Sequence, residues 1–223
     1  LPVVDENQKL IGRITSDDII DVITEEAEED IYSLAGVGEY NHPIYSSFIS
    51  KTKSRLPWLL VTLMGEIVIA FIISIYFSGT LVNFILLAAF MPAVMATGGS
   101  VGIQTSAIVV RALGMGTINT SQAIKVIFSE LKLSLLLGAI CGLLAGLSGF
   151  FINGNTEEGT KFFTVIFFSL SLASVMSAVF GAAFPLFLNK LKVDPANGSG
   201  PIVTMANDMF SAISYLFIAL LII

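Results

Sequence analysis

A single aspartate, Asp208, is the only charged residue in the apolar run from Pro201 to Ile223. It follows Pro201 by seven residues, which is about 10 Å along a helix that rises 1.5 Å per residue. A carboxylate at that depth in a bilayer costs about 2.5–3.5 kcal/mol on insertion scales and usually faces a pore, a cavity or a partner. Thr204 and Asn207 supply hydroxyl, amide and carbonyl oxygens, which suit hard cations. We therefore predict a cation site at Asp208, against the alternative of a protonated aspartate hydrogen-bonded within the helix packing.

The number of carboxylates favours magnesium as the cation. Magnesium gives up its waters reluctantly and is often held through them by one or two carboxylates. One aspartate per chain, doubled by a two-fold axis, meets that requirement, whereas a dehydrated calcium site needs more carboxylates than the apolar segments contain. No basic residue within another span is available to neutralise Asp208, because Arg111 stands near a helix end.

A second unusual segment is the glycine-rich interruption at residues 98–104 of an otherwise apolar run. Irregular backbone at membrane depth is tolerated where it lines a water-filled cavity or is covered by protein. The spacing of Gly98 and Gly102 also fits close packing of two helices, so both interpretations stay open. The candidate pore-lining residues of this segment are Gly98, Gly99, Ser100 and Gln104.

Glu66 is the only acidic or basic residue between Pro57 and Phe77. It either forms a pair within the helix bundle or lies near the permeation path. Small residues that recur every four positions at Gly138, Gly142 and Gly146, and at Ser174, Ala178 and Ala182, predict faces for close helix packing.

The N-terminal region is strongly acidic. Residues 1–39 carry eleven acids and two basic residues, a net charge of −9, while the remaining residues sum to +3 and give −6 in all. The part richest in acids is either a solvated helix face or a divalent-cation sensor, in which bound ions relieve the repulsion between the carboxylates. The acids of that part are Asp17, Asp18, Asp21, Glu25, Glu26, Glu28, Glu29 and Asp30.

The elements that position these groups are predicted to be membrane-spanning helices. The chain is 55% hydrophobic and only 13% charged, about half the usual charge of a soluble domain, and a bilayer core requires about 20 apolar helical residues. Five runs qualify, of which the second is either one long helix or two short pieces. They cover residues 57–77, 81–113, 133–151, 162–188 and 201–223.

The distribution of Lys and Arg predicts the orientation. With the acidic region in the cytosol, eight basic residues fall on inner segments and Lys161 alone on an outer loop. The N-terminus is then inside and the C-terminus outside. Residues 43–49 read as a short interfacial helix with Pro43 at its first position, and His42 beside it as a plain polar residue.

Sequence features of enzymes are missing. The sequence contains no phosphate-binding loop, no His-Glu-x-x-His zinc motif and no Gly-x-Ser-x-Gly nucleophile elbow. Cys141, the single cysteine, lies in an apolar run and has no partner for a disulfide within one chain. We predict no enzymatic activity and no organic cofactor.

Several motifs together resemble a known family. The stretch from Leu1 to Ile20 looks like the end of a CBS (cystathionine-β-synthase-type) repeat, and because the sequence starts inside this motif we expect the chain to be a fragment. The rest resembles the membrane domain of the MgtE family of magnesium channels. The motifs that carry this resemblance are Arg55-Leu56-Pro57-Trp58-Leu59, Gly98-Gly99-Ser100-Val101-Gly102-Ile103-Gln104, Val193-Asp194-Pro195-Ala196 and Ser199-Gly200-Pro201 running on to Asn207-Asp208.

The resemblance implies a homodimer with five spans per subunit and a pore on the two-fold axis, built largely from the second and fifth spans. The family's pore aspartate, which holds hydrated magnesium, corresponds to Asp208, its carbonyl contact to Thr204, and a cytosol-side aspartate to Asp194. The counterparts of the acids that bind magnesium and favour closure are Asp18, Asp21, Glu26, Glu29 and Asp30. Ser100 stands where the family usually has Asn, and Ile103 where a polar residue is common, which bears on fine selectivity.

The predicted protein is thus an all-α polytopic membrane protein with a short α/β remnant of a CBS domain. Residues 1–24 form the end of the CBS repeat, 25–55 the acidic connecting segment and interfacial helix, and 56–223 the pore domain. We expect an inner-membrane channel that passes Mg²⁺ inward, gated by cytosolic Mg²⁺, with a second copy, the lipid bilayer and divalent cations as partners and no nucleic acid. The alternatives are an ion-coupled secondary transporter, with Glu66 as a proton or sodium site, and a non-transporting CBS-linked regulator.

Overall fold

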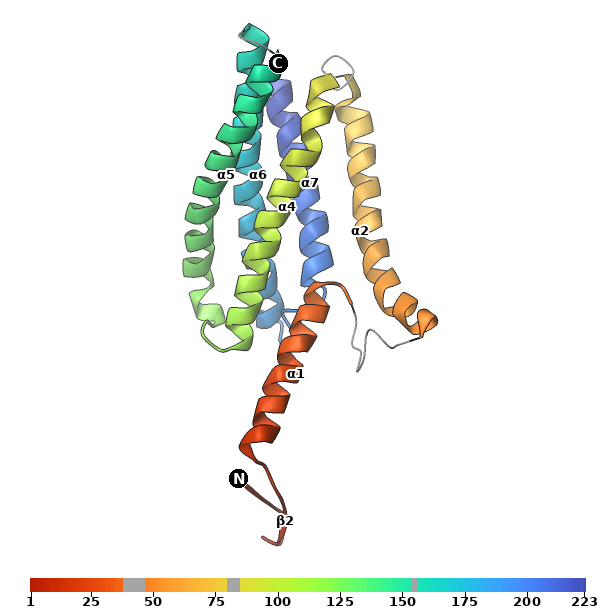
Figure 1. The fold of residues 1–223 in the computed structure, drawn as a ribbon, viewed down its shortest axis with the longest axis vertical. Coiled ribbons are helices and arrows are strands. Elements are labelled where there is room, and N and C mark those ends of the chain that lie inside the picture. Colours follow the sequence, from red (N-terminus) through yellow and green to blue (C-terminus); the bar gives the residue numbers. More distant parts are fainter. Residues whose placement is uncertain (38–46, 80–84, 154–155) are drawn as a thin grey trace.

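The main body of the protein is a bundle of long helices (Figure 1). The computed structural model describes residues 1–37, 47–79, 85–153 and 156–223. Its described part contains five helices long and apolar enough to cross a membrane, which confirms the predicted number. They are α2 (Phe48–Tyr76), α4 (Ile85–Gly114), α5 (Ala123–Asn153), α6 (Glu157–Lys190) and α7 (Ser199–Ile222).

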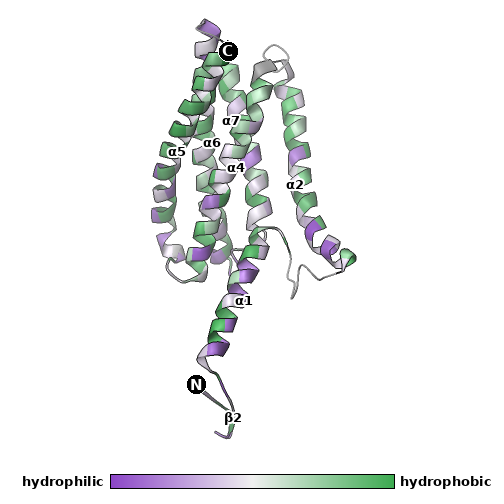
Figure 2. Ribbon diagram, in the orientation of Figure 1, coloured by the Kyte–Doolittle hydropathy of each residue, from purple (hydrophilic) through white to green (hydrophobic). Residues whose placement is uncertain are grey.

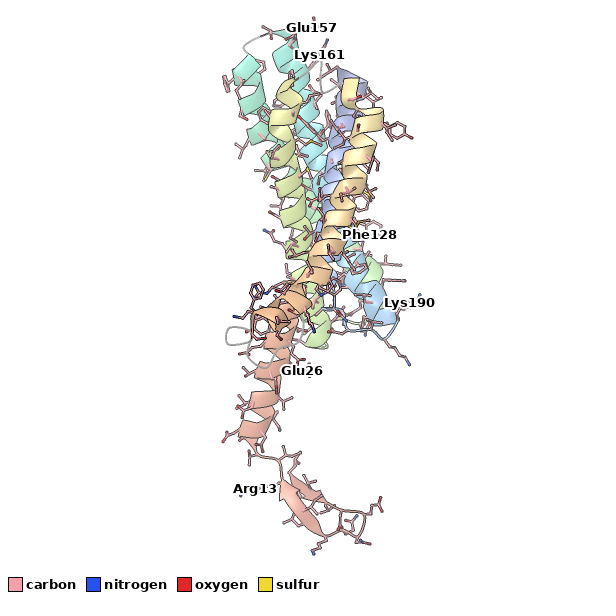
Figure 3. All side chains as sticks on the ribbon, turned by 90° about the vertical axis from the view of Figure 1, so that its right-hand side faces the viewer. Arg13, Glu26, Phe128, Glu157, Lys161 and Lys190 are labelled. Carbon is pink, nitrogen blue, oxygen red and sulfur yellow. The ribbon has the colours of Figure 1, made fainter. Side chains whose placement is uncertain are left out.

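The hydropathy of the helices follows their place in the molecule. The bundle helices are mostly hydrophobic along their length. Helix α1 (Ser16–Leu34) extends from one end of the bundle, and hydrophobic and hydrophilic residues alternate along it (Figure 2). Glu157 and Lys161 lie at the opposite end from Glu26 and Arg13 (Figure 3). The end that carries α1 is called the α1 end below.

Helix α6 lies at the centre of the bundle and packs against α4, α5 and α7. Its contact with α5 uses the predicted small-residue faces. A Cβ atom added to Gly138 would come within 2.9 Å of Ser174, and one added to Gly142 within 2.7 Å of the carbonyl oxygen of Phe167. Farther from the α1 end, the core includes Tyr215, which is fully buried and donates a hydrogen bond from its hydroxyl to the carbonyl oxygen of Leu87 at 2.9 Å.

Helix α2 has a different environment from the others. Within the described part of the chain it packs against α7 alone, and most of its large apolar side chains are exposed. It begins at Phe48 and continues through Pro57 without a break, so Phe48 and Ile49 belong to the spanning helix, not to a separate interfacial helix. His42, Pro43 and the rest of the predicted interfacial segment up to residue 46 lie outside the described residues.

Helix α4 is continuous through its glycines, so the alternative of two short pieces is wrong. Glycine in a helix interior costs about 1 kcal/mol relative to alanine, but here the missing side chains admit the neighbouring helices. A Cβ atom on Gly102 would lie 1.9 Å from the Asn207 amide nitrogen of α7, and one on Gly181 of α6 would lie 2.4 Å from the Gly102 carbonyl oxygen. The glycines of this helical segment therefore serve close contact with α6 and α7 on two sides.

The N-terminal part is a small hairpin followed by α1. Strands β1 (Pro2–Val4) and β2 (Leu10–Arg13) pair antiparallel, with Pro2 opposite Arg13. Helix α1 begins with a capping box in which Thr15 and Asp18 bond each other's backbone N–H groups. These hydrogen bonds from Thr15 lower the pKa of Asp18. The helix runs unbroken across the predicted boundary at residues 24–25, and its assignment to a CBS repeat stays a prediction.

Candidate ion-binding site

The backbone that leads into α7 places Asp208 within the bundle. Gly198 precedes the helix in the left-handed conformation, with φ of 71°, which glycine adopts without steric cost. Pro201 lies in the first turn, where backbone N–H groups have no partner within the helix. The helix is then regular to Ile222, so Asp208 lies one turn beyond Thr204 and roughly 10 Å beyond Pro201.

Asp208 is half-buried and meets two other helices. Its carboxyl group lies in hydrogen-bonding contact with the carboxyl group of Glu66 from α2. A Cβ atom on Gly99 of α4 would lie 3.7 Å from its Oδ1 atom, so α4 presents bare backbone at this point. The structure therefore brings together three of the sequence-predicted residues, one from each of α2, α4 and α7.

Asn207, the neighbour of Asp208, is directed elsewhere. It is fully buried against Gly102, and neither its amide nitrogen nor its amide oxygen has a hydrogen-bond partner in the described part of the chain. Gly98 similarly contacts Ser211 of α7 and lies near Ser177 of α6. These buried serines are not among the residues predicted from the sequence, where their one signal is a hydroxyl among small residues on a packing face. The pore-lining role of Asn207 and Gly98 stays a prediction.

Ser100 and Gln104 lie on another side of α4. They line a cavity of about 390 Å³ between α4 and α5, together with Cys141 of α5. Gln104 also lines a small neighbouring cavity, where the Thr105 hydroxyl donates to the Glu130 carboxylate of α5 at 3.2 Å. The glycines of this motif thus lie against α6 and α7, whereas its polar residues face α5. The pore-lining role of Ser100 and Gln104 stays a prediction.

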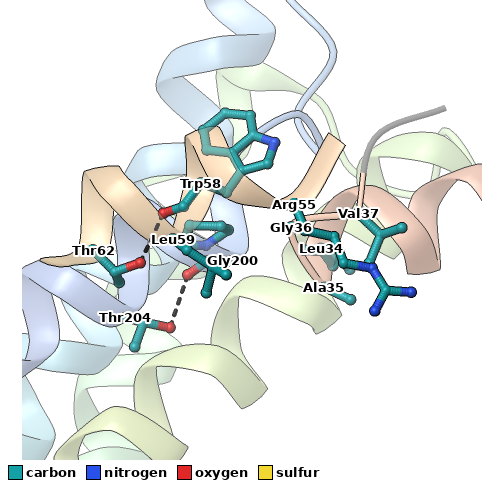
Figure 4. A pocket seen from close by; sticks show the side chains of 11 residues that line it. Leu34, Ala35, Gly36, Val37, Arg55, Trp58, Leu59, Thr62, Gly200 and Thr204 are labelled. Atoms are coloured by element: carbon teal, nitrogen blue, oxygen red, sulfur yellow. Dashed lines mark hydrogen bonds between the residues drawn. The ribbon is translucent and has the colours of Figure 1, made fainter. Parts of the chain in front are cut away.

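Thr204 borders a cavity of about 570 Å³ at the α1 end of the bundle (Figure 4). The cavity is enclosed by the end of α1, by α2 with Arg55, Trp58 and Thr62, and by the first turns of α7. The hydroxyls of Thr62 and Thr204 each donate to the backbone carbonyl four residues earlier in their own helix, at 2.7 and 2.9 Å. Thr62 and Thr204 therefore stand on facing helices, one turn before Glu66 and Asp208 respectively.

A second pair of acids lies at the α1 end. Asp30 of α1 is partly buried, and the last residue of α4, Gly114, lies against its carboxylate. Burial raises the pKa of Asp30, the neighbouring charges of Asp194 and Glu26 raise it further, and Arg111 opposes them. Asp194 is exposed and accepts a hydrogen bond from the Ala196 N–H at 2.9 Å. Of the predicted regulatory residues, Asp30 therefore lies near Glu26, and it also lies near Asp194, the aspartate predicted at the cytosolic side of the pore.

The other predicted regulatory acids are farther along α1 or face solvent. Asp18 caps the start of the helix, and Asp21 and Glu29 are exposed. Within the described residues no three acidic, histidine or cysteine side chains come close enough to form a metal site by themselves. A cation bound by the described residues of one chain would therefore use two of their carboxylates at most, with water or a second copy supplying further ligands.

The sequence of this chain matches a known protein family. Residues 91–218 match the family model MgtE, described as a divalent cation transporter. The chain belongs to the MgtE family. The matched range includes Gly99, Thr204, Asp194 and Asp208, whereas Glu66 and the acids of α1 lie before it.

Relatives from three bacteria extend the similarity to nearly the whole chain. It is 37% identical over 219 residues to the magnesium transporter MgtE of Bacillus subtilis, covering 98% of this chain and 47% of the relative. The corresponding protein of Enterococcus faecalis is 33% identical over 219 residues, with the same coverage. That of Thermus thermophilus is 31% identical over 225 residues, covering 100% of this chain and 48% of the relative. The chain thus spans about half the length of these MgtE transporters.

The MgtE assignment agrees with the character of the bundle. Five apolar helices make the chain a membrane protein of the all-α polytopic class. The predicted family resemblance is therefore confirmed, and the expected absence of enzymatic chemistry is consistent with relatives that are named as transporters.

Proposed function

We propose that this chain forms the ion path of a magnesium transporter and that Asp208 recruits the ion. The observation that carries the proposal is the half-buried Asp208 carboxylate, which lies beside the bare backbone of Gly99 and in contact with Glu66. The described part of the chain contains one ion pair, Glu157–Lys161, so a cation is the natural counter-charge of Asp208. Membership of a divalent-cation transporter family supports the same conclusion.

The ion passes as hydrated Mg²⁺ through a pore on the axis of a homodimer. One or two carboxylates suffice for magnesium that keeps several of its waters, and a two-fold axis supplies an Asp208 from each subunit. The path runs beside Gly99 of α4 and beside Thr204 and Asp208 of α7, with Glu66 from α2.

The membrane potential drives the flux inward. With the α1 end in the cytosol, an inside-negative potential contributes about 2.3 kcal/mol per charge for each 100 mV, and a divalent ion gains about twice that value. No coupling ion is then needed. In the intact protein, cytosolic Mg²⁺ bound near Asp30 and Asp194 closes the pore, because it neutralises carboxylates that otherwise repel each other.

Flux into vesicles tests the proposal. The chain is reconstituted in proteoliposomes, and Mg²⁺ uptake is measured with and without an imposed potential for the wild type and for Asp208→Ala. We expect potential-driven uptake in the wild type and its loss in the variant. Uptake and Mg²⁺ binding that are unchanged in Asp208→Ala would refute the role of this residue.

The contact between Glu66 and Asp208 also favours one alternative, an ion-coupled exchanger. Two carboxyl groups in contact can hold a proton or a sodium ion between them. The same vesicles separate the two functions. Uptake that ignores the potential and requires a pH or sodium gradient favours the exchanger, and uptake that follows the potential alone favours the channel.

A further inference from the structure

The packing of α2 against α7 holds Glu66 at the same depth in the bundle as Asp208. The inward face of α2 runs through Trp58, Thr62, Glu66 and Ile69, at the three- and four-residue spacing of one helix face. Ile69 is 3% exposed. Next to Glu66, Gly65 packs so tightly on α7 that an added Cβ atom would lie 2.1 Å from the Met205 side chain. The bare backbone of Gly65 therefore lies directly against the Met205 side chain, and this close approach of α2 to α7 places Glu66 beside Asp208.

The rest of α2 offers no other use for a carboxylate. Its outer face is a row of exposed apolar residues that includes Leu63, Ile67 and Phe71, and α7 is its one neighbour among the described helices. An ionisable group on such a helix normally faces a partner or a water-filled path. In this chain the partner is the Asp208 carboxyl group.

The pair also lies directly beyond a cavity. Thr62 and Thr204, one turn before the two acids, line the 570 Å³ cavity at the α1 end. A hydrated ion in that cavity would meet Glu66 and Asp208 together as it moves into the bundle, because both acids follow the cavity wall by the same helical distance.

Two adjacent carboxylates distinguish ions by charge. When both are ionised they repel each other, and a cation between them removes the repulsion. A divalent ion cancels both charges, whereas a monovalent ion leaves one of them uncompensated at a site of low polarity. A second carboxylate at the Asp208 site would therefore improve the discrimination in favour of divalent ions.

We propose that Glu66 is a specificity-determining residue of the ion path, which contacts the ion together with Asp208 and selects divalent over monovalent cations. The inference rests on the proposed function of Asp208 and gives Glu66, the residue of α2 on the proposed path, a defined task. It assigns Glu66 a charge-dependent role, which helix packing alone would not require.

The test compares Glu66→Gln with a matched control, Glu130→Gln. Glu130 also lies on a bundle helix and is partly buried, but its partner is Thr105 on another side of α4. Mg²⁺ uptake into proteoliposomes gives the half-saturating concentration and the maximal rate, and the reversal potential in mixed Mg²⁺ and Na⁺ gives the relative permeability.

For Glu66→Gln we expect the half-saturating Mg²⁺ concentration to rise about tenfold, as for loss of a residue that supports a metal ligand, and the permeability to Na⁺ relative to Mg²⁺ to rise. Glu130→Gln should match the wild type in both. Should Glu66→Gln yield no folded protein, Glu66→Asp carries the test, since it keeps the charge and withdraws it by one methylene. For that variant a raised half-saturating concentration is expected.

Two outcomes separate this inference from the proposed function. Unchanged affinity and selectivity in the Glu66 variant, alongside loss of uptake in Asp208→Asn, would overturn the role of Glu66 and leave that of Asp208 intact. Normal uptake in Asp208→Asn would remove the proposed function itself.

Discussion

Two pairs of acids lie at two levels of this molecule, and their surroundings differ. Glu66 and Asp208 meet between α2 and α7, inside the spanning part of the bundle, whereas Asp30 lies within electrostatic reach of Asp194 at the α1 end, where Asp194 is exposed. Two unit charges 4 Å apart interact by about 1 kcal/mol in water and about 4 kcal/mol at an effective dielectric constant of 20. The inner pair therefore requires a counter-charge far more strongly than the outer pair does.

This difference in surroundings allows carboxylates to serve two tasks in one molecule, ion transport and ion sensing. A pair that requires a cation suits the path that ions occupy in transit. A pair whose repulsion is moderate can stay empty and respond to the ion concentration around it, as a sensor must. In this interpretation the position of the acids along the bundle, more than their number, separates transport from regulation.

The largest effect we predict tests the packing that fixes the inner pair. Gly102→Ala should abolish folded protein or lower its thermal midpoint strongly, because the added Cβ would lie 1.9 Å from the buried Asn207 amide nitrogen, and overpacking a core typically costs about 1–3 kcal/mol. Gly99→Ala, three residues earlier in α4, is the matched control. Its Cβ would make an ordinary contact with Asp208 at 3.7 Å.

Thermal unfolding in detergent, followed by circular dichroism, measures both variants. Gly99→Ala should unfold within a few degrees of the wild type. Equal midpoints for Gly102→Ala and Gly99→Ala would mean that α4 and α7 are not held together by this contact.

The sequence was sufficient to predict what depends on composition and local pattern. Length and apolar character indicate the five spans, and a lone carboxylate in an apolar run marks Asp208 without any structure. The four-residue spacing of Gly138, Gly142 and Gly146 likewise predicts a packing face, because that spacing keeps residues on one side of a helix.

The sequence was insufficient to predict contacts that depend on how a helix is rotated about its own axis. Helix α4 is apolar almost all round, so no periodic pattern tells which face meets α7 and which meets α5. Gly99 and Ser100 are adjacent in the sequence yet have different neighbours. The contact between Glu66 and Asp208 also depends on α2 packing against α7, and two spans with one acid each do not specify that pairing.

A smaller effect is expected at the outer pair. Replacing Asp30 by Asn removes a carboxylate whose pKa is raised by burial and by Asp194, so the end of α1 should dock more firmly on the bundle in the absence of Mg²⁺. In the wild type, millimolar Mg²⁺ should slow hydrogen exchange at residues 30–36 about tenfold, and Asp30→Asn should lose this response because one of the two ligands is gone.

Asp17→Asn provides the control for this experiment. Asp17 is an exposed acid in the first turn of the same helix, so its removal changes the net charge equally and leaves the outer pair intact. Persistence of the Mg²⁺ response in Asp30→Asn would exclude Asp30 as a ligand and leave the α1 end without a sensor at this position.

The smallest effect is expected at the far end of α1, where an acid serves the backbone instead of an ion. The Asp18 carboxylate accepts hydrogen bonds from the Thr15 N–H and hydroxyl at 2.7 and 2.8 Å, and these lower its pKa. A lowered pKa in the folded state means that the cap stabilises the helix at pH values above the ordinary carboxyl pKa and loses that contribution as the pH falls through the folded-state pKa.

Thr15→Ala should therefore speed hydrogen exchange in the first turn of α1 about fivefold at neutral pH. The difference from the wild type should shrink in acid, while Mg²⁺ should have no influence on it, since the charge of Asp18 is already satisfied by the helix N-terminus. An Mg²⁺-dependent rate in this turn would instead place Asp18 among the regulatory ligands, as the family resemblance implies, and the division of the acids of α1 into a helix cap and an ion sensor would have to be abandoned.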